Sequence, residues 1–255
     1  MLSYDRESKS TGGNQVLETQ TRMATWYEDS SSIYPQALQK LQTRTLAYER
    51  LKRALDFLAA AFFLVVFSPL LLLIAVAIKI DGPGPVLFIQ RRTGRYGRPF
   101  NFFKFRSMSY SKNHAQIHRE FVRQYANGVD KDQTTNGLHK PFQNGPTITR
   151  VGKFLRQSSL DELPQLWNIL RGDMSFVGPR AWADYELENY KDWHYRRLEV
   201  TPGLTGLAQI SGRSALSFDN IIRLDIDYIE NRSLWMDFKI LLKTIPVVLT
   251  GANTG

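Results

Sequence analysis

One stretch of the chain is almost entirely apolar. All 22 residues from Phe57 to Ile78, between Asp56 and Lys79, are apolar except Ser68 and Pro69. As a straight helix this run would be roughly 33 Å long, enough for a hydrocarbon core of about 30 Å. It begins far from the N-terminus and no cleavage site follows it, so it is not a secretory signal. The pattern favours a membrane segment at 57–78 over a buried helix of a soluble core.

The middle of this segment predicts a break. Pro69 cannot donate a hydrogen bond to the carbonyl of Val65, and the hydroxyl of Ser68 is placed to serve that carbonyl instead. Both flanks are basic, and basic residues prefer the cytoplasmic side of a membrane. A helix–break–helix that enters and leaves by one face puts both flanks there, whereas a spanning helix puts only one. We expect a re-entrant segment bent at Ser68–Pro69, with a single pass as the alternative.

Short elements are predicted on either side. Residues 1–45 read as a flexible polar tail that leads into a helix, because residues 1–33 lack apolar periodicity and leucines recur from about residue 35. The turn at 81–85 precedes two strands, 86–90 and 100–105, which form a hairpin around glycines at 94 and 97. A helix at 112–125 and a polar loop at 126–147 follow.

The C-terminal run Leu234–Leu249 mixes aromatic and aliphatic residues with Lys239 and Lys243. It is too charged to span a bilayer. An amphipathic helix of this kind lies in a membrane interface or packs on a protein core, and the sequence leaves both open.

Composition narrows the class of partner. Hydrophobic residues make up 43% of the chain and charged residues 22%, which excludes wholesale disorder. Cysteine is absent, which removes disulfides and thiol chemistry. The net charge is +9, and residues 79–106, with seven basic side chains against Asp81, supply +6 of it. Because this stretch follows the apolar run, a membrane surface or a phosphate group is a better partner than DNA.

Two histidines have metal-ligand spacing. His114 and His118 are four residues apart on the helix predicted at 112–125. The glutamate of the zinc-protease motif is missing between them, so an exposed helix face is the better interpretation.

The stretch Ser159–Arg180, SLDELPQLWNILRGDMSFVGPR, carries the most chemistry. Ser159 and Glu162 have the spacing of a capping box. That motif predicts Asp161 and Glu162 in the first turn of a helix, where two carboxylates favour the helix dipole. Free amides and nearby cations also suit a metal-bound diphosphate, and aspartate can attack phosphorus. The candidate cations are Lys104, Arg106, Arg156, Arg171 and Arg180.

These motifs together resemble the bacterial sugar transferase family, the monotopic phosphoglycosyl transferases that act on polyprenyl phosphate. The matching pieces, in chain order, are Lys52-Arg53, Ser68-Pro69, Asp81 to Pro85, Phe88 to Gly94, Lys104 to Met108, Thr149 to Gly152, Ser159 to Arg180, Thr201 to Gln209 and Gly212-Arg213. The resemblance covers residues 46–250, which we expect to form the transferase domain.

Two departures from the family pattern stand out. The chain has Gly145-Pro146-Thr147 where the family usually has Asp-Pro-Arg, and Ala181 where it usually has proline. They affect local phosphate or nucleotide contacts rather than the reaction class.

The resemblance implies an α+β, mostly helical fold, seated on the cytoplasmic face of the cell inner membrane by a re-entrant helix and interfacial amphipathic helices. It implies transfer of a sugar 1-phosphate from a UDP-sugar to polyprenyl phosphate, with Mg²⁺, as the first membrane step of glycan assembly. Anionic inner-leaflet lipids are expected partners and nucleic acid is not; homo-oligomerisation stays open.

By position in the motif, the resemblance makes Asp161 the nucleophile and Glu162 its partner in metal binding. Arg156 and Arg180, with Lys104 and Arg106, would bind substrate phosphates. Two other classes remain as alternatives: a membrane-anchored binding protein without activity, which would release no UMP, and a membrane-tethered nucleic-acid-binding protein, whose binding would depend steeply on salt.

Overall fold

The computed structural model describes residues 35–109, 148–212 and 216–249, with residues 21, 119, 120, 122, 123 and 125; its side chains are described from residue 46 onward, apart from Asn189 and Leu249. Several expectations therefore lie outside the described residues. They are the tail at 1–33 apart from residue 21, most of the helix expected at 112–125, the pair His114 and His118, the loop at 126–147, and the departure at 145–147.

Two helices account for the apolar segment. Helix α2 spans Pro35–Val66 and helix α3 spans Ser68–Asp81, and their axes differ by 61°. The Ser68 hydroxyl donates to the Val65 carbonyl at 2.8 Å, which compensates for the N–H that Pro69 lacks. The predicted break is confirmed. Within the described chain, no single helix is long and apolar enough to cross a membrane, whereas this bent pair passes that test by length and composition.

The predicted hairpin is confirmed. Strand β1, Leu87–Thr93, pairs antiparallel with β2, Pro99–Phe105, and Phe88 lies opposite Lys104. Strand β1 runs three residues beyond its expected end. Strand β4, Trp182–Ala183, adds to its other edge, so the strand order is β2-β1-β4. A second small sheet joins β3, Ser175–Val177, to β5, Gly203–Thr205, in parallel.

Helices make up most of the rest, so the described chain is mostly helical with a small β component, as expected. They are α5 (Arg150–Gln157), α6 (Gln165–Arg171), α7 (Leu207–Ile210), α8 (Phe218–Asn231) and α9 (Leu234–Leu249), with 3-10 segments at Leu160–Glu162, Asp184–Asn189 and Asp192–Glu199. Thr149 begins α5 by accepting a hydrogen bond from the Gly152 amide.

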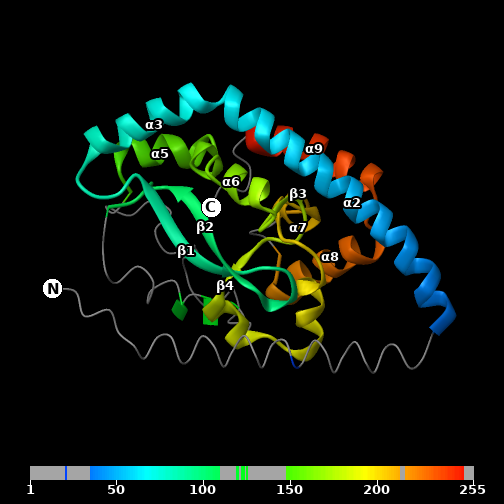
Figure 1. The fold of residues 1–255 in the computed structure, drawn as a ribbon. Coiled ribbons are helices and arrows are strands. Elements are labelled where there is room, and N and C mark those ends of the chain that lie inside the picture. Colours follow the sequence, from blue (N-terminus) through cyan, green and yellow to red (C-terminus); the bar gives the residue numbers. More distant parts are fainter. Residues whose placement is uncertain are drawn as a thin grey trace.

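The bent pair α2–α3 lies along one side of the molecule, with α5, α6 and the hairpin beneath it (Figure 1). Ala60 of α2 packs with Phe102, Leu166 and Ile169. In the same way, Ile74 and Ile78 of α3 pack with Phe105 and Leu155. Burying these apolar side chains holds both helices against the hairpin and α6.

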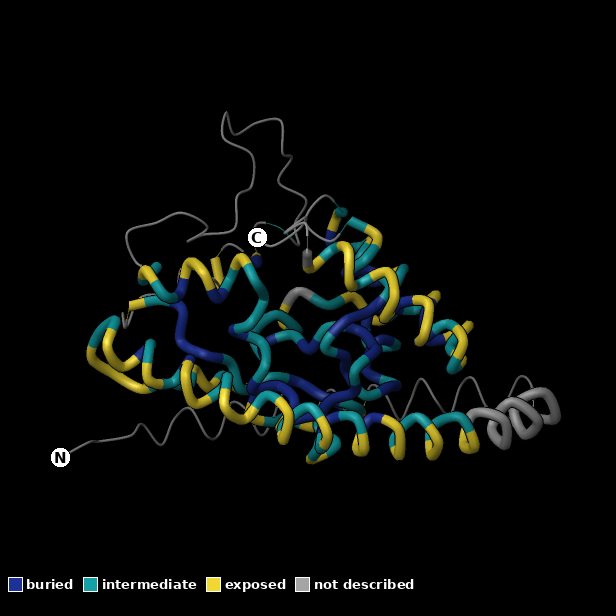
Figure 2. Tube along the Cα trace, turned by 90° about the horizontal axis from the view of Figure 1, so that it is seen from above, coloured by how far each residue is buried: buried dark blue, intermediate teal, exposed yellow. Residues whose placement is uncertain are grey.

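The opposite face of α2–α3 is exposed along its whole apolar length (Figure 2). Val65 is 75% exposed and Ile80 82% exposed. Helix α9 packs on the core through Ile240, which lies in one buried cluster with Val177 and Tyr228. Its other face exposes Trp235 and Phe238, so the C-terminal run both packs on the core and leaves apolar side chains exposed. Further exposed apolar residues on the pair are Leu51, Leu55, Phe57, Leu58, Phe62, Val66, Leu72, Leu73 and Val76.

Candidate functional site

The capping box predicted at Ser159 does not form. Ser159 adopts a left-handed backbone conformation (φ 56°) and its side chain makes no capping hydrogen bond. The chain makes a single 3-10 turn at Leu160–Glu162, and α6 begins only at Gln165. Asp161 and Glu162 therefore precede the helix rather than lie in its first turn. The left-handed residue redirects the chain after α5, so that Asp161 is turned inward.

Asp161 is almost completely buried and is paired with a cation from the hairpin. Its side chain is 3% exposed, and Lys104 Nζ of β2 lies 2.6 Å from its Oδ2. Burial raises the pKa of Asp161; the Lys104 charge opposes that shift, the Glu162 charge adds to it, and Arg156 of α5 opposes it. The resulting site holds a desolvated carboxylate beside an ammonium group.

Glu162 lies between two of the expected cations. Its Oε1 is 3.8 Å from Lys104 Nζ and 3.9 Å from Arg180 Nη1. The structure thus brings Lys104, Arg156 and Arg180 to the two carboxylates from three different elements. Such an arrangement can bind an anion next to a buried nucleophile.

Arg106 is used differently. Its guanidinium donates to the carbonyls of Ile78, Gly82 and Pro83, at 2.9, 2.7 and 2.5 Å. These carbonyls belong to the end of α3 and the turn that follows. Arg106 therefore fixes the start of the hairpin against α3, which is a structural role and not the predicted binding of a substrate phosphate.

Arg171 also lies away from the carboxylates. It is the last residue of α6, and its Nε is 3.4 Å from Asp173 Oδ2. Helix α6 is seven residues long, about 10 Å, and Arg171 lies at the end of it that is farther from the turn that carries Asp161. The structure does not bring Arg171 to the site.

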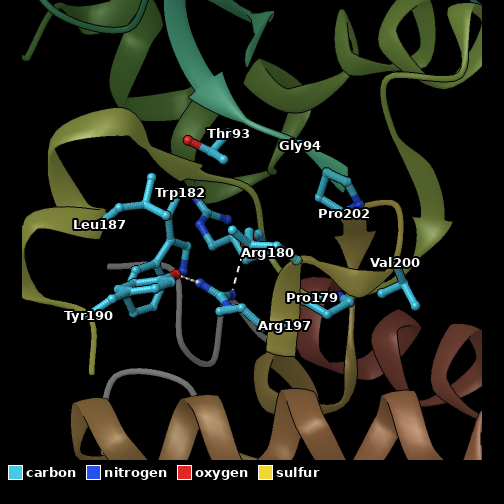
Figure 3. Close-up of a pocket in the computed structure, with 11 residues that line it drawn as sticks. Thr93, Gly94, Pro179, Arg180, Trp182, Leu187, Tyr190, Arg197, Val200 and Pro202 are labelled. Atoms are coloured by element: carbon cyan, nitrogen blue, oxygen red, sulfur yellow. Dashed lines mark hydrogen bonds between the residues drawn. The ribbon is translucent and has the colours of Figure 1, made fainter. Parts of the chain in front are cut away.

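Arg180 borders a small cavity of about 10 Å³, together with Trp182, Tyr190 and Arg197 (Figure 3). That volume holds about one water molecule and no substrate. Arg180 and Arg197 both line the cavity, and Arg197 is 2% exposed. The cavity is thus part of the support behind Arg180.

Two supporting residues were missed by sequence reasoning. Asn168 of α6 is fully buried; its Nδ2 donates to the Asn101 carbonyl and its Oδ1 accepts from the Phe103 amide. These bonds tie α6 to the strand that carries Lys104. Arg197 is the second; its ion pair with Asp225 joins residues 28 apart in the sequence, at 2.6 Å. The polar Asn168 within the otherwise informative motif at 159–180 could have been recognised from the sequence. No local pattern pointed to Arg197.

The basic stretch at 79–106 is less available to a membrane than its sequence indicated. Arg92 donates to the Ala181 carbonyl and lies 3.7 Å above the Phe102 ring. Arg95 is bidentate to Glu49, at 2.9 and 3.0 Å. These two side chains stabilise the fold. Arg91 remains 60% exposed, with Asp184 as its partner.

A metal site made by protein groups alone is not present in the described part of the chain, which contains no group of three His, Asp or Glu side chains close enough to hold an ion. Asp161 and Glu162 supply two carboxylates. Mg²⁺ is commonly bound by one or two carboxylates plus substrate phosphates. Two carboxylates therefore fit a magnesium ion that is also bound by substrate phosphates.

The family comparison agrees with the motifs. A family model described as bacterial sugar transferase matches residues 47–251. A galactosyl transferase, CpsE, of Streptococcus agalactiae is 43% identical over 79% of this chain and 43% of its own length.

Two further relatives are covered more fully. A UDP-glucose:undecaprenyl-phosphate glucose-1-phosphate transferase of Caulobacter vibrioides is 43% identical over 82% of this chain and 73% of its own length. The exopolysaccharide production protein ExoY of Rhizobium meliloti is 44% identical over 77% of this chain and 84% of its own length. The chain thus spans less than half of the streptococcal relative but most of these two.

Proposed function

The chain belongs to the bacterial sugar transferase family, and on that premise we propose that it transfers a sugar 1-phosphate from a UDP-sugar to polyprenyl phosphate, of the undecaprenyl type. The products are UMP and a polyprenyl diphosphate sugar. One observation carries the proposal: the buried Asp161 carboxylate lies against Lys104, with Glu162 and Arg180 beside them. This reaction is the first membrane step in the assembly of a surface glycan such as an exopolysaccharide.

The reaction proceeds by two displacements at one phosphorus atom. An Asp161 carboxylate oxygen attacks the sugar-bearing phosphorus of the UDP-sugar; the bond from that phosphorus to the bridging oxygen breaks, and UMP leaves with the electron pair. A phosphate oxygen of the acceptor then attacks the same phosphorus and releases the Asp161 carboxylate. Each step forms one P–O bond and breaks one, so no proton has to be moved.

The cations of the site support both steps. Lys104 Nζ reaches Asp161 and Glu162 at 2.6 and 3.8 Å, so the same ammonium can pass from the carboxylate to an arriving phosphate. Arg180 and Arg156 add positive charge next to the diphosphate. Placing donors where negative charge develops lowers the barrier to phosphoryl transfer. Direct attack by the acceptor, without an enzyme intermediate, is the competing route.

The proposed mechanism includes a magnesium ion. Asp161 and Glu162 would hold Mg²⁺ jointly with the donor diphosphate, as the two-carboxylate donor set allows. The ion would neutralise part of the negative charge on the phosphate groups. Glu162 then serves mainly to hold the ion, which leaves an oxygen of Asp161 for attack.

We further propose that α2–α3 enters and leaves the cytoplasmic leaflet of the inner membrane by the same face. The 61° bend and the hydrogen bond from Ser68 to Val65 support this arrangement. So does the exposed apolar face, which includes Leu58, Leu72 and Leu73. A polar group freed at a helix break in lipid needs such a local partner.

The test is UMP release by the purified chain in lipid nanodiscs. A panel of UDP-sugars is supplied with undecaprenyl phosphate and Mg²⁺, and Asp161→Asn serves as the matched control. We expect one or a few UDP-sugars to release UMP with the wild-type chain and none with Asp161→Asn. UMP release from no donor would refute the function and leave the inactive binding protein in its place.

A further inference from the structure

The backbone that carries Arg180 is held at three consecutive carbonyl groups, each by a different partner. The Pro179 carbonyl accepts from the Gly203 amide at 2.8 Å. The Arg180 carbonyl accepts from Arg197 Nη2 at 2.9 Å, and the Ala181 carbonyl from Arg92 Nη1 at 2.8 Å. Two of the three donors are arginine side chains, each stacked on an aromatic ring.

Contacts with three neighbouring side chains fix the position of the Arg197 guanidinium. Its guanidinium lies 4.2 Å from the Trp182 ring centroid, and its Nη1 donates to Tyr190 at 2.6 Å (Figure 3). Its Nη2 also donates to Asp225 at 2.6 Å. At 2% exposure it cannot contact a substrate. The planar fork of arginine fits several acceptors at once, which lysine does not.

A buried ion pair is a costly way to stabilise a core. Arg197 and Asp225 have side chains that are each 1% exposed, and replacing such a pair by well-packed apolar residues is often neutral or stabilising. The pair therefore calls for a role other than stability. Its Nη2 links it to the backbone of a residue whose side chain lies 3.9 Å from Glu162.

We propose that Arg197 is a positioning residue for Arg180: it clamps the Arg180 carbonyl, so that the Arg180 side chain is held in place beside Glu162 for a substrate phosphate. This inference rests on the proposed function, because it assigns Arg180 a phosphate to bind. Arg92 holds the following carbonyl in the same way. Ala181, a departure from the family pattern, is thereby fixed through its backbone.

The experiment compares three variants in nanodiscs. Arg197→Met with Asp225→Leu removes the clamp and both buried charges. Arg197→Lys is the second test variant; it keeps a positive charge for Asp225 without the fork. Tyr190→Phe is the matched control, because it removes one hydrogen bond of Arg197 and leaves the bond to the Arg180 carbonyl.

The first readout is amide hydrogen exchange of residues 178–183. We expect exchange at least tenfold faster in both clamp variants and unchanged in Tyr190→Phe. Unchanged exchange in the clamp variants, or equal acceleration in the control, would overturn the proposal.

The second readout is the KM for the UDP-sugar in UMP release. The clamp variants should raise KM at least tenfold, with a smaller effect on kcat, and adding Arg180→Ala should raise it no further. If the increases in KM caused by the clamp variants and by Arg180→Ala multiply when combined, Arg197 does not act through Arg180. Absence of UMP release from the wild-type chain would refute the proposed function, while the exchange measurement would still decide the positioning.

Discussion

Lys104 Nζ lies 2.6 Å from Oδ2 of Asp161, and this ion pair connects the second strand of the hairpin to the turn before α6. The same ammonium is 3.8 Å from Glu162. A single side chain thus links both carboxylates of the site to the rigid sheet. The proposed mechanism requires that this ion pair affect catalysis as well as the stability of the fold.

Replacing Lys104 separates those effects. Lys104→Met leaves the buried Asp161 carboxylate without its partner, which lowers the free energy of unfolding, and it removes a cation from the site, which should lower kcat/KM about 100-fold. Lys104→Met combined with Asp161→Leu should recover stability without recovering activity. Thermal unfolding and UMP release measure the two effects. Full activity in folded Lys104→Met would contradict the role of Lys104.

Asn168 should be required for stability. Asn168→Leu leaves the Asn101 carbonyl and the Phe103 amide without their side-chain partners, and each buried unpaired group costs about 1–3 kcal/mol. The exposed Asn231→Ala, which removes hydrogen bonds to Asp227, should cost less than about 0.5 kcal/mol. Denaturant unfolding in detergent compares the two. An equal, small loss in both variants would show that Asn168 does not tie α6 to β2.

The re-entrant arrangement is open to labelling, because the chain has no cysteine of its own. Ala47→Cys and Arg98→Cys place exposed thiols on the two flanks of the bent pair. In intact cells both should resist a membrane-impermeant thiol reagent, and both should react after lysis. Labelling of one flank alone in intact cells would establish a spanning segment. Pro69→Ala should shift some molecules toward that state, because it removes the cause of the break.

His194 should make stability depend on pH. It is fully buried, its Nδ1 accepts from the Lys191 amide, and its Nε2 lies 3.3 Å from Asp219 Oδ1. Burial lowers the pKa of His194 to about 4; Asp219 opposes that shift, and the charges of Lys191 and Arg197 add to it.

Since the unfolded chain binds this proton near pH 6.5, stability should fall as the pH drops from about 6.5 toward 4, by up to about 3 kcal/mol. His194→Gln, which does not titrate, should lose this component. The melting temperature measured across that range checks the prediction. An identical pH dependence in wild type and His194→Gln would contradict it.

Local patterns predicted the local features well. The break at Ser68–Pro69, the hairpin and the helix 234–249 each follow from a periodicity or from a residue with fixed chemistry. The capping box did not form because Ser159 takes a left-handed backbone conformation and its side chain makes no capping hydrogen bond. The structural roles of Arg106 and Arg92 could not be predicted for a related reason: the sequence does not reveal that distant backbone carbonyls will accept the hydrogen bonds of a basic side chain.

Only some residues of the candidate site could be predicted from the sequence. The carboxylates and the cations Lys104, Arg156 and Arg180 could be selected as motif residues, and the structure brings them together. The residues that hold these side chains in place could not be predicted from the sequence. Arg197 and Asn168 act through contacts between segments far apart in the sequence, and no local spacing encodes such contacts.

The covalent role of Asp161 is the central claim, and isotope exchange without acceptor tests it most directly. Labelled UMP is incubated with the UDP-sugar donor and the purified chain in nanodiscs that contain no polyprenyl phosphate. The account predicts that label appears in the UDP-sugar, that a sugar-phosphate adduct appears on the Asp161 peptide, and that Asp161→Asn abolishes both. Absence of exchange, together with substantial turnover by Asp161→Asn once acceptor is added, would contradict it and establish direct transfer.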